Sequence, residues 1–214
     1  MRFAREGLPF IAGFLLAGVL VTTLAYALGL KGVGSALAGS PFAALGLFSA
    51  WFFRDPDRAA PSGEGVVLAP ADGRIVAVRE SEAGPSLAIF LNVFDVHVNR
   101  APVAGSVKEV AYRRGGFRAA FDERAGEENE RNDLVLSSDA GEVRVRQIAG
   151  LIARRIVCRV RPGDRLAAGE RFGLIRFGSR TDLRLPPGGE IFVQVGDRVR
   201  GGETIVGRMP RGLP

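Results

Sequence analysis

The stretch from residue 7 to residue 53 contains one charged side chain, Lys31. Lys31 separates two uncharged runs, residues 7–30 and 32–53. Each run is about as long as the ~20 apolar residues that an α-helix needs to cross the hydrocarbon core of a bilayer. The second run is rich in Gly and Ala and contains Pro41, which also fits a shallow or re-entrant helix. A chain that begins in this way is expected to be attached to a membrane.

Arginines flank this apolar region on both sides. Arg2 and Arg5 precede it, and Arg54 and Arg58 follow it. Because cytoplasmic segments carry the excess of basic residues, this distribution predicts a helical hairpin with both ends in the cytoplasm. The alternative is a secretory signal peptide cleaved near "AYA" at residues 25–27, but the apolar region is long and a second one follows directly. We therefore expect the rest of the chain at the cytoplasmic face of the cell membrane.

The residues beyond Arg58 follow a different pattern. Short segments rich in β-branched residues, such as "RIVAV", "SLAIFL" and "EVRVRQ", are bounded by Gly, Pro or Asp. This pattern is typical of a mostly antiparallel β domain. We predict a membrane-associated helical hairpin with its linker at residues 1–58 and a β-rich domain at residues 59–214.

Two pairs of similar segments within the chain refine the predicted architecture. "APADGRIVAV" (69–78) resembles "APVAGSVKEV" (101–110), and "PGDRLAAGERFG" (162–173) resembles "VGDRVRGGETIVG" (195–207). The second pair is similar to biotinyl and lipoyl carrier domains, so we predict a carrier-like β sandwich or flattened barrel with internal pseudo-repeats. Carrier chemistry itself needs a lysine on a hairpin tip, and residues 109–214 contain none.

The scarcity of several residue types limits the chemistry. All but two of the 29 basic residues are arginines, and neither Lys31 nor Lys108 is a good candidate for the Schiff-base lysine of a pyridoxal phosphate enzyme. A single histidine, His97, and a single cysteine, Cys158, argue against a zinc site. The arginine-rich composition and net charge of +6 admit anionic lipid, phosphate ligands or nucleic acid as partners. Next to a membrane hairpin, the basic segment "RRGGFRAAF" (113–121) fits lipid headgroups rather than nucleic acid. We expect no pyridoxal phosphate, no metal and no nucleic-acid partner.

The pair Gly178-Ser179 is by itself typical of a turn. A set of segments, however, together resembles the phosphatidylserine decarboxylase proenzymes of the short bacterial and archaeal type. They cover most of residues 52–186 in family order: "FFRDPDR" (52–58), "LAPADGRIV" (68–76), "NVFDVHVNRAP" (92–102), "ENERN" (128–132), "QIAGLIARRIVC" (147–158) and "GERFGLIRFGSRTD" (169–182).

This resemblance implies that the chain cuts itself. Ser179 Oγ would attack the Gly178 carbonyl, and the resulting ester would be eliminated to give chains 1–178 and 179–214, which stay associated. Residue 179 would become a pyruvoyl group, the cofactor that forms a Schiff base with phosphatidylserine and releases phosphatidylethanolamine. This ketone would serve as the electron sink that pyridoxal phosphate provides in other enzymes, which fits the lack of a suitable lysine. The resemblance further implies a phospholipid substrate in the membrane and is compatible with a homo-oligomer.

The resemblance also implies helpers for Ser179. In the family the Asp of the "ADG" motif, here Asp72, works with a histidine to activate the nucleophilic serine, although Asp-Gly is also a common hairpin corner. His97 matches the first of two histidines in the longer branch of the family, and Arg100 stands at the second. We expect His97 to serve self-cleavage, with roles in decarboxylation or phosphate binding as alternatives.

The "ENERN" segment offers candidate substrate ligands. Asn129, Arg131 and Asn132 carry amide and guanidinium donors that suit a phosphodiester or a carboxylate. A solvated charged loop is the alternative interpretation.

Three other functions remain open at this stage. The same chemistry could act on archaetidylserine, an ether lipid, or on a soluble amino acid, although the apolar hairpin argues against the latter. A membrane-tethered carrier-like domain without catalysis is the third, and it requires that the chain remain intact.

Overall fold

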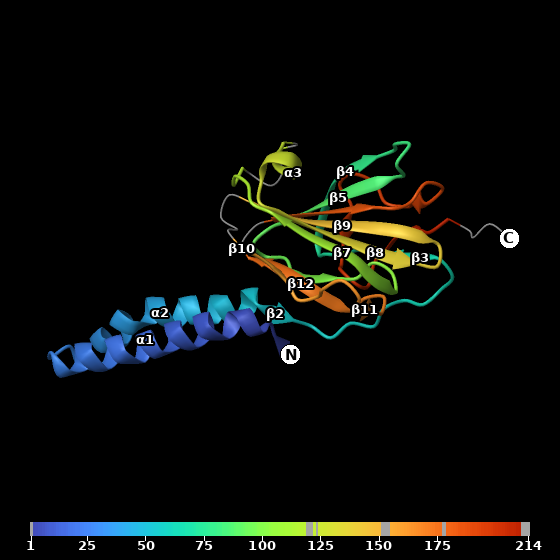
Figure 1. The fold of residues 1–214 in the computed structure, drawn as a ribbon. Helices are drawn as coiled ribbons and strands as arrows, with labels where there is room; N and C mark the ends of the chain where they lie inside the picture. Colours follow the sequence, from blue (N-terminus) through green and yellow to red (C-terminus); the bar gives the residue numbers. More distant parts are fainter. Residues whose placement is uncertain (1, 119–121, 123, 151–154, 177–178, 211–214) are drawn as a thin grey trace. The chain divides into compact units, whose positions relative to one another are not determined.

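The computed structural model describes residues 2–118, 122, 124–150, 155–176 and 179–210 (Figure 1). The chain divides into two compact units, Met1–Asp57 and Arg58–Pro214. The first is a pair of helices and the second is built mainly from antiparallel strands, which confirms the fold class predicted from the sequence.

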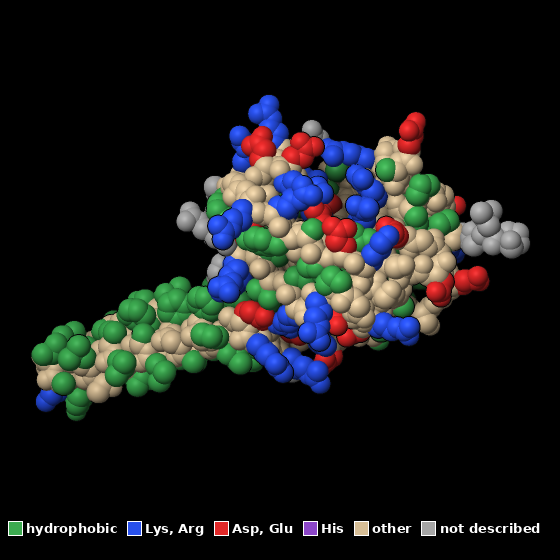
Figure 2. All heavy atoms as spheres, in the orientation of Figure 1, with side chains coloured by type: hydrophobic (Ala, Val, Ile, Leu, Met, Phe, Trp, Pro, Cys, Tyr) green, Lys and Arg blue, Asp and Glu red, His purple; other side chains and the backbone are tan. Residues whose placement is uncertain are grey.

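The first unit is a helical hairpin of α1 (Leu8–Ala27) and α2 (Val33–Phe52). Glycines let the two helices approach closely: a Cβ at Gly39 would lie 2.0 Å from Oγ1 of Thr22, and one at Gly46 would lie 2.7 Å from a methyl carbon of Leu15. Such small-residue contacts are typical of helix pairs in membranes. The large apolar side chains project outward instead, as the hydrophobic surface of the pair in Figure 2 shows.

The two ends of the hairpin are joined. A short 3-10 helix (Arg5–Gly7) leads into α1, and β1 (Arg2–Phe3) pairs antiparallel with β2 (Arg54–Asp55). Both helices are long and apolar enough to cross a membrane. With the ends tied together, a chain that crosses twice has both ends on the same side.

Pro41 does not interrupt α2. Proline has no N–H for the carbonyl of the residue four positions earlier, which here is Leu37. The Ser40 hydroxyl donates to that Leu37 carbonyl oxygen at 2.9 Å. A neighbouring side chain thus replaces the missing backbone hydrogen bond, and the helix continues to Phe52.

The described residues of the second unit form three antiparallel sheets and a one-turn helix. Their strand orders are β11-β7-β8-β9-β13-β5-β4-β15, β10-β12-β6 and β14-β16-β3. The elements are β3 (Val66–Leu68), β4 (Gly73–Arg79), β5 (Ser86–Leu91), β6 (Val98–Arg100), β7 (Gly105–Arg113), α3 (Ala125–Glu128), β8 (Arg131–Ser138), β9 (Gly141–Ala149), β10 (Arg155–Cys158), β11 (Arg165–Leu166), β12 (Arg171–Arg176), β13 (Ser179–Arg184), β14 (Glu190–Ile191), β15 (Arg198–Val199) and β16 (Ile205–Arg208).

The similar segments found in the sequence occupy equivalent places in this unit. β4 and β7 begin at the matching glycines, Gly73 and Gly105, and each has a break in register two residues later. β15 pairs with the first two residues of β4, and β11 pairs in the same way with the first two residues of β7. The pseudo-repeats are therefore real structural repeats.

Extending this equivalence divides the unit into two halves. Half A contains β3–β5 and β13–β16, and half B contains β6–β12. Each half supplies four neighbouring strands to the large sheet and one complete three-stranded sheet. Half B is contiguous in sequence and is inserted between β5 and β13 of half A. The chain returns to half A at Ser179.

The core lies on the inner face of the large sheet. Leu87, Val145, Leu134 and Leu183 form one cross-strand row of buried side chains. The next row toward the start of β13 contains polar residues instead, and Ser179 belongs to the row after that.

Candidate active site

Ser179 is the first residue of β13, a strand in the middle of the large sheet. It is paired with Leu91 of β5 and Ala149 of β9. The residue is completely buried, and its Oγ has no hydrogen-bond partner within the described part of the chain. A buried hydroxyl without a partner costs stability, so its presence marks a candidate for chemistry.

The chain changes sheets immediately before Ser179. β12 ends at Arg176 in the sheet β10-β12-β6, and β13 begins in the eight-stranded sheet. Gly178, the sequence-predicted partner of Ser179, lies outside the described residues. The predicted cleavage position thus falls at the junction of half B with half A.

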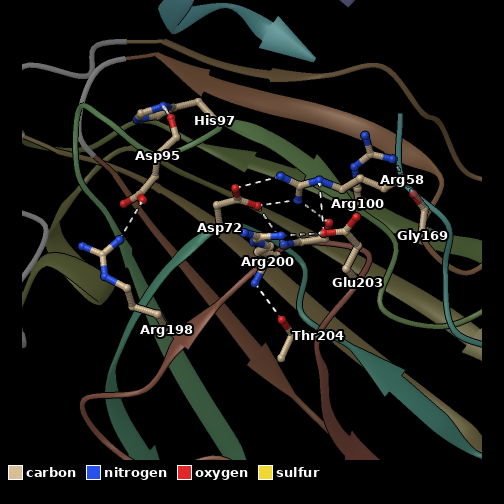
Figure 3. Close-up of polar contacts among 11 residues, drawn as sticks. Arg58, Asp72, Asp95, His97, Arg100, Gly169, Arg198, Arg200, Glu203 and Thr204 are labelled. Atoms are coloured by element: carbon tan, nitrogen blue, oxygen red, sulfur yellow. Dashed lines mark hydrogen bonds and ion pairs between the residues drawn. The ribbon is translucent and has the colours of Figure 1, made fainter. Parts of the chain in front are cut away.

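His97 is buried and hydrogen-bonded to the segment that precedes Ser179. Its carbonyl oxygen accepts a hydrogen bond from the Ile175 N–H at 3.3 Å, four residues before Ser179. Residues 92–97 continue from Leu91, the strand partner of Ser179. Nδ1 of His97 lies 3.0 Å from the carbonyl oxygen of Asp95 (Figure 3). A carbonyl can only accept, so Nδ1 carries the proton and a neutral ring presents its lone pair at Nε2.

The turn before His97 is fixed by its own side chains. The Asn92 N–H donates to a carboxylate oxygen of Asp95 at 2.9 Å, and the Phe94 N–H donates to the Asn92 side-chain oxygen at 2.7 Å. Arg198 of β15 lies 3.6 Å from the Asp95 carboxylate. Phe94 is 65% exposed on this ordered turn. An apolar ring is therefore held outward three residues from the buried imidazole.

Asp72 is engaged in an ion pair that the sequence did not reveal. Arg58 donates to both of its carboxylate oxygens, at 2.5 and 2.8 Å (Figure 3). The Gly201 N–H donates to one of these oxygens at 2.8 Å. Arg58 also donates to the Gly201 carbonyl at 2.5 Å. The two charged side chains are only 6% and 13% exposed. We call Arg58, Asp72 and Gly201 the clasp; it joins residues on either side of the predicted cleavage position.

The three residues of the "ENERN" segment have internal partners. The side-chain N–H groups of Asn129 donate to the carbonyls of Arg118 and Ala149, at 2.9 and 2.7 Å, and its oxygen accepts from the Arg118 N–H. Arg131 donates to the Glu127 carbonyl, and the Asn132 amide donates to Gln147. Asn129 and Asn132 are buried, so this segment orders the end of β9 and the interior rather than forming a solvated loop.

A row of buried polar residues, which we call the polar row, was missed by the sequence interpretation. Asn132 donates to Gln147 at 3.0 Å, Gln147 donates to Asn99 at 2.9 Å, and Asn99 donates to Thr181 at 3.2 Å. All four are at most 1% exposed. Strand alternation could have indicated this row. In "VRVRQIA" the residues Val143, Val145 and Gln147 share one face of the strand, so the polar side chain of Gln147 is expected to point into the core.

Cys158 lies next to the polar row. Its thiol lies near the Asn132 side chain and donates to the Val160 carbonyl oxygen at 3.8 Å, and burial raises the pKa of the Cys158 thiol above its ordinary value. No cluster of three or more His, Cys, Asp or Glu side chains suited to a metal occurs among the described residues.

The opposite face of β13 borders a cleft of about 410 Å³. There Arg180 makes a two-pronged ion pair with Asp182, at 2.6 and 2.9 Å, and Arg146 pairs with Asp133 at 2.5 Å. Burial raises the pKa of Asp182, and Arg180 lowers it to a smaller extent. In each pair the opposite charges compensate each other, and both pairs lie on the face of the sheet opposite the Ser179 side chain.

The comparisons with known proteins agree on one family. The family model of phosphatidylserine decarboxylase matches residues 45–207. The chain is similar to proteins named phosphatidylserine decarboxylase proenzyme. The relative from Symbiobacterium thermophilum is 50% identical, with 97% of this chain and 96% of the relative covered. The relative from Magnetococcus marinus is 46% identical, with 96% and 94% covered, and that from Solibacter usitatus is 47% identical, with 97% of each chain covered.

These matches extend over nearly the whole chain, including Ser179, His97 and the clasp. The resemblance inferred from the sequence is therefore confirmed: this chain belongs to the phosphatidylserine decarboxylase family.

Proposed function

We propose that the chain is a self-cleaving enzyme that decarboxylates phosphatidylserine to phosphatidylethanolamine. The observation that carries the proposal is Ser179, a fully buried hydroxyl without a partner among the described residues, in a family whose relatives are named proenzymes. A pyruvoyl group derived from this residue fits the site, because the orphaned hydroxyl is the atom that the processing reaction consumes.

Self-cleavage begins at Ser179 and uses groups of the chain itself. Oγ attacks the Gly178 carbonyl carbon, its proton passes to a base, and the amide nitrogen leaves to give an ester. Loss of the Ser179 α-proton then expels the Gly178 carboxylate and leaves dehydroalanine, which water converts to a pyruvoyl group and ammonia. His97 is the proposed base, because the Asp95 carbonyl places the proton of the neutral ring at Nδ1, which makes Nε2 the ring nitrogen that can accept one.

A pyruvoyl group at residue 179 would supply the ketone that serves as electron sink for a primary-amine substrate during loss of carbon dioxide. The surrounding residues bind and shield this site. Leu91 and Ala149 flank residue 179 and are fully buried, which keeps water away from the reacting atoms. His97 Nε2 can return a proton to the substrate carbon after decarboxylation.

The nesting of half B within half A supports lasting association of the two chains. The short chain, 179–214, would contain β13 to β16. β13 lies between β5 and β9 of the long chain, β15 pairs with β4, and β16 pairs with β3. Cutting the peptide before Ser179 removes none of these pairings.

We further propose that the helical hairpin attaches the enzyme to the cytoplasmic face of the membrane. Arg2, Arg5 and Arg54 gather at its joined ends, and basic residues favour the cytoplasmic side. Trypsin added outside sealed cells should therefore leave the β unit intact. Digestion of that unit from outside would refute the orientation.

Intact mass spectrometry of the purified protein tests the proposed function. We expect chains 1–178 and 179–214, with the short chain lighter by one ammonia than a peptide that begins with serine. Ser179→Ala should remain one chain and release no carbon dioxide from phosphatidylserine vesicles. An uncut wild-type chain with decarboxylase activity would exclude the pyruvoyl mechanism, and an uncut inactive chain would favour a non-catalytic domain.

A further inference from the structure

We propose that the polar row is a positioning device, which holds residue 179 in place after the peptide before it has been cut. The inference rests on the proposed self-cleavage at Ser179. It assigns positioning roles to Thr181 and Asn99, neither of which is required to touch the substrate.

The polar row lies one step along the strands from Ser179. Thr181 follows Ser179 by two residues, so both side chains project from the same face of β13. Thr181 pairs with Gln147 of β9, and Gln147 pairs with Asn132 of β8. Asn99 belongs to β6 of a different sheet and bonds both Gln147 and Thr181. The row therefore connects the large sheet with the sheet β10-β12-β6 directly below the reacting residue.

The hydrogen bonds of the row run in one direction. Each side-chain amide donates toward Thr181, and Asn99 donates to the Thr181 hydroxyl oxygen. Hydrogen bonds aligned in series strengthen one another in a medium of low dielectric constant. The Thr181 oxygen is thus held by the far end of a chain of polarised groups, and the row permits one arrangement of the strand.

The surrounding backbone is shaped to admit the row. A Cβ at Gly173 would lie 2.2 Å from the Val157 carbonyl oxygen and 3.0 Å from the Gln147 side-chain nitrogen. Glycine at this position lets β12 pair closely with β10 and leaves room for the Gln147 amide beside it. The neighbouring row of Leu87, Val145 and Leu183 shows that apolar side chains fill the same core one step away. Burying amides here gives up apolar packing, which is expected where geometry matters more than stability.

Cleavage creates the need for such a device. Before the cut, the chain continues from β12 into β13; afterwards residue 179 is a free chain end, and chain ends fray unless they are tied down. Pairing with β5 and β9 restrains β13 within the plane of the sheet. The Asn99–Thr181 bond restrains it perpendicular to that plane, two residues from the new end.

The test compares processed enzymes that differ at Thr181. Thr181→Val keeps the shape of the side chain but removes the hydroxyl, and Thr181→Ser keeps the hydroxyl. Ser138→Ala is the control, because it removes a hydroxyl that bonds the Gly141 carbonyl at the opposite end of β9. For each variant one measures the extent of cleavage by mass, the carbonyl at residue 179 by hydrazide labelling, and kcat and KM on the fully labelled fraction.

We expect Thr181→Val to be cut and labelled but to lose about tenfold to a hundredfold in kcat at unchanged KM, since small misplacements of reacting groups cost that much. Thr181→Ser should recover most of this loss, and Ser138→Ala should match the wild type. Wild-type kcat in Thr181→Val, or an equal loss in Thr181→Ser, would overturn the proposal. An uncut, unlabelled wild type would instead overturn the proposed function.

Asn99→Ser provides a second variant if Thr181→Val fails to fold. It breaks the contact between the two sheets while leaving the Thr181 hydroxyl in place, and the same loss of kcat at constant KM is expected. If neither variant folds, the polar row is a requirement of core stability and the positioning role is refuted.

Discussion

Replacing Asp72 by alanine should destabilise the β unit strongly, because the buried Arg58 loses its two-pronged partner and keeps Glu203, 3.9 Å from its Nε, as a more distant counter-charge. Removal of one partner from a buried ion pair costs about 3–5 kcal/mol, and the 6% and 13% exposure of these side chains places the clasp near the lower end of that range. For a unit of this size about 3 kcal/mol corresponds to a fall in Tm of roughly 6–12 °C. Thermal unfolding followed by circular dichroism, in detergent and in a Ser179→Ala background that prevents cleavage, measures this fall.

Arg58→Met is the partner experiment and separates structure from catalysis. It removes the clasp but leaves the Asp72 carboxylate in the chain. If Asp72 also assists Ser179, Arg58→Met should still cut itself when Asp72→Ala does not, even where both are destabilised. Equal cleavage in both variants would show that Asp72 acts only through the clasp. A fall in Tm of less than about 2 °C for Asp72→Ala would refute the energetic reasoning.

Three further results are expected. His97→Ala should accumulate the uncut chain; a chain that is cut but inactive would move His97 to the decarboxylation step. Phe94→Ser should lower activity on phosphatidylserine vesicles more than activity on dispersed short-chain substrate. Phe192→Ser is the control, because Phe192 is also exposed. Equal effects of Phe94→Ser on both substrates would exclude a contact of Phe94 with lipid. Cys158 should react slowly with iodoacetamide at pH 8, because its raised pKa keeps most of the thiol protonated. The alkylation rate, measured by mass spectrometry, should still increase above pH 8.5, the ordinary thiol pKa being about 8.5. A rate that reaches its plateau below that pH would contradict the raised pKa.

Local patterns in the sequence predicted the parts of this structure that depend on local physics. A run of residues with one charge gave two helices because apolar helices of that length follow directly from composition. The similar segments predicted internal pseudo-repeats, and in the structure their matching glycines, Gly73 and Gly105, begin β4 and β7 where the backbone passes close to a neighbouring strand. The resemblance through "FGSRTD" and "FDVHVNR" identified the family.

Other features depend on contacts between distant residues and left little trace in the sequence. Nothing in "RDPDR" indicates that Arg58 will pair with Asp72 and reach Gly201. Asn129 was predicted as a substrate ligand from its donor groups, a role that stays a prediction, whereas the structure shows those groups bonded to backbone carbonyls. The polar row could be suspected at Gln147 from strand alternation, but its closure by Asn99 requires the second sheet.

If the proposed cut before Ser179 occurs, the insertion of half B into half A makes it an indicator that folding is complete. Ser179 reaches its place beside Leu91 only after residues 92–178 have closed a long loop and β13 has entered between two strands already distant in sequence. Such non-local pairing forms late and slowly. A chain that stalls before this step would keep its serine, so the appearance of the short chain reports that the whole β unit has been assembled. Processing would therefore produce the catalytic group only in molecules that have completed their fold.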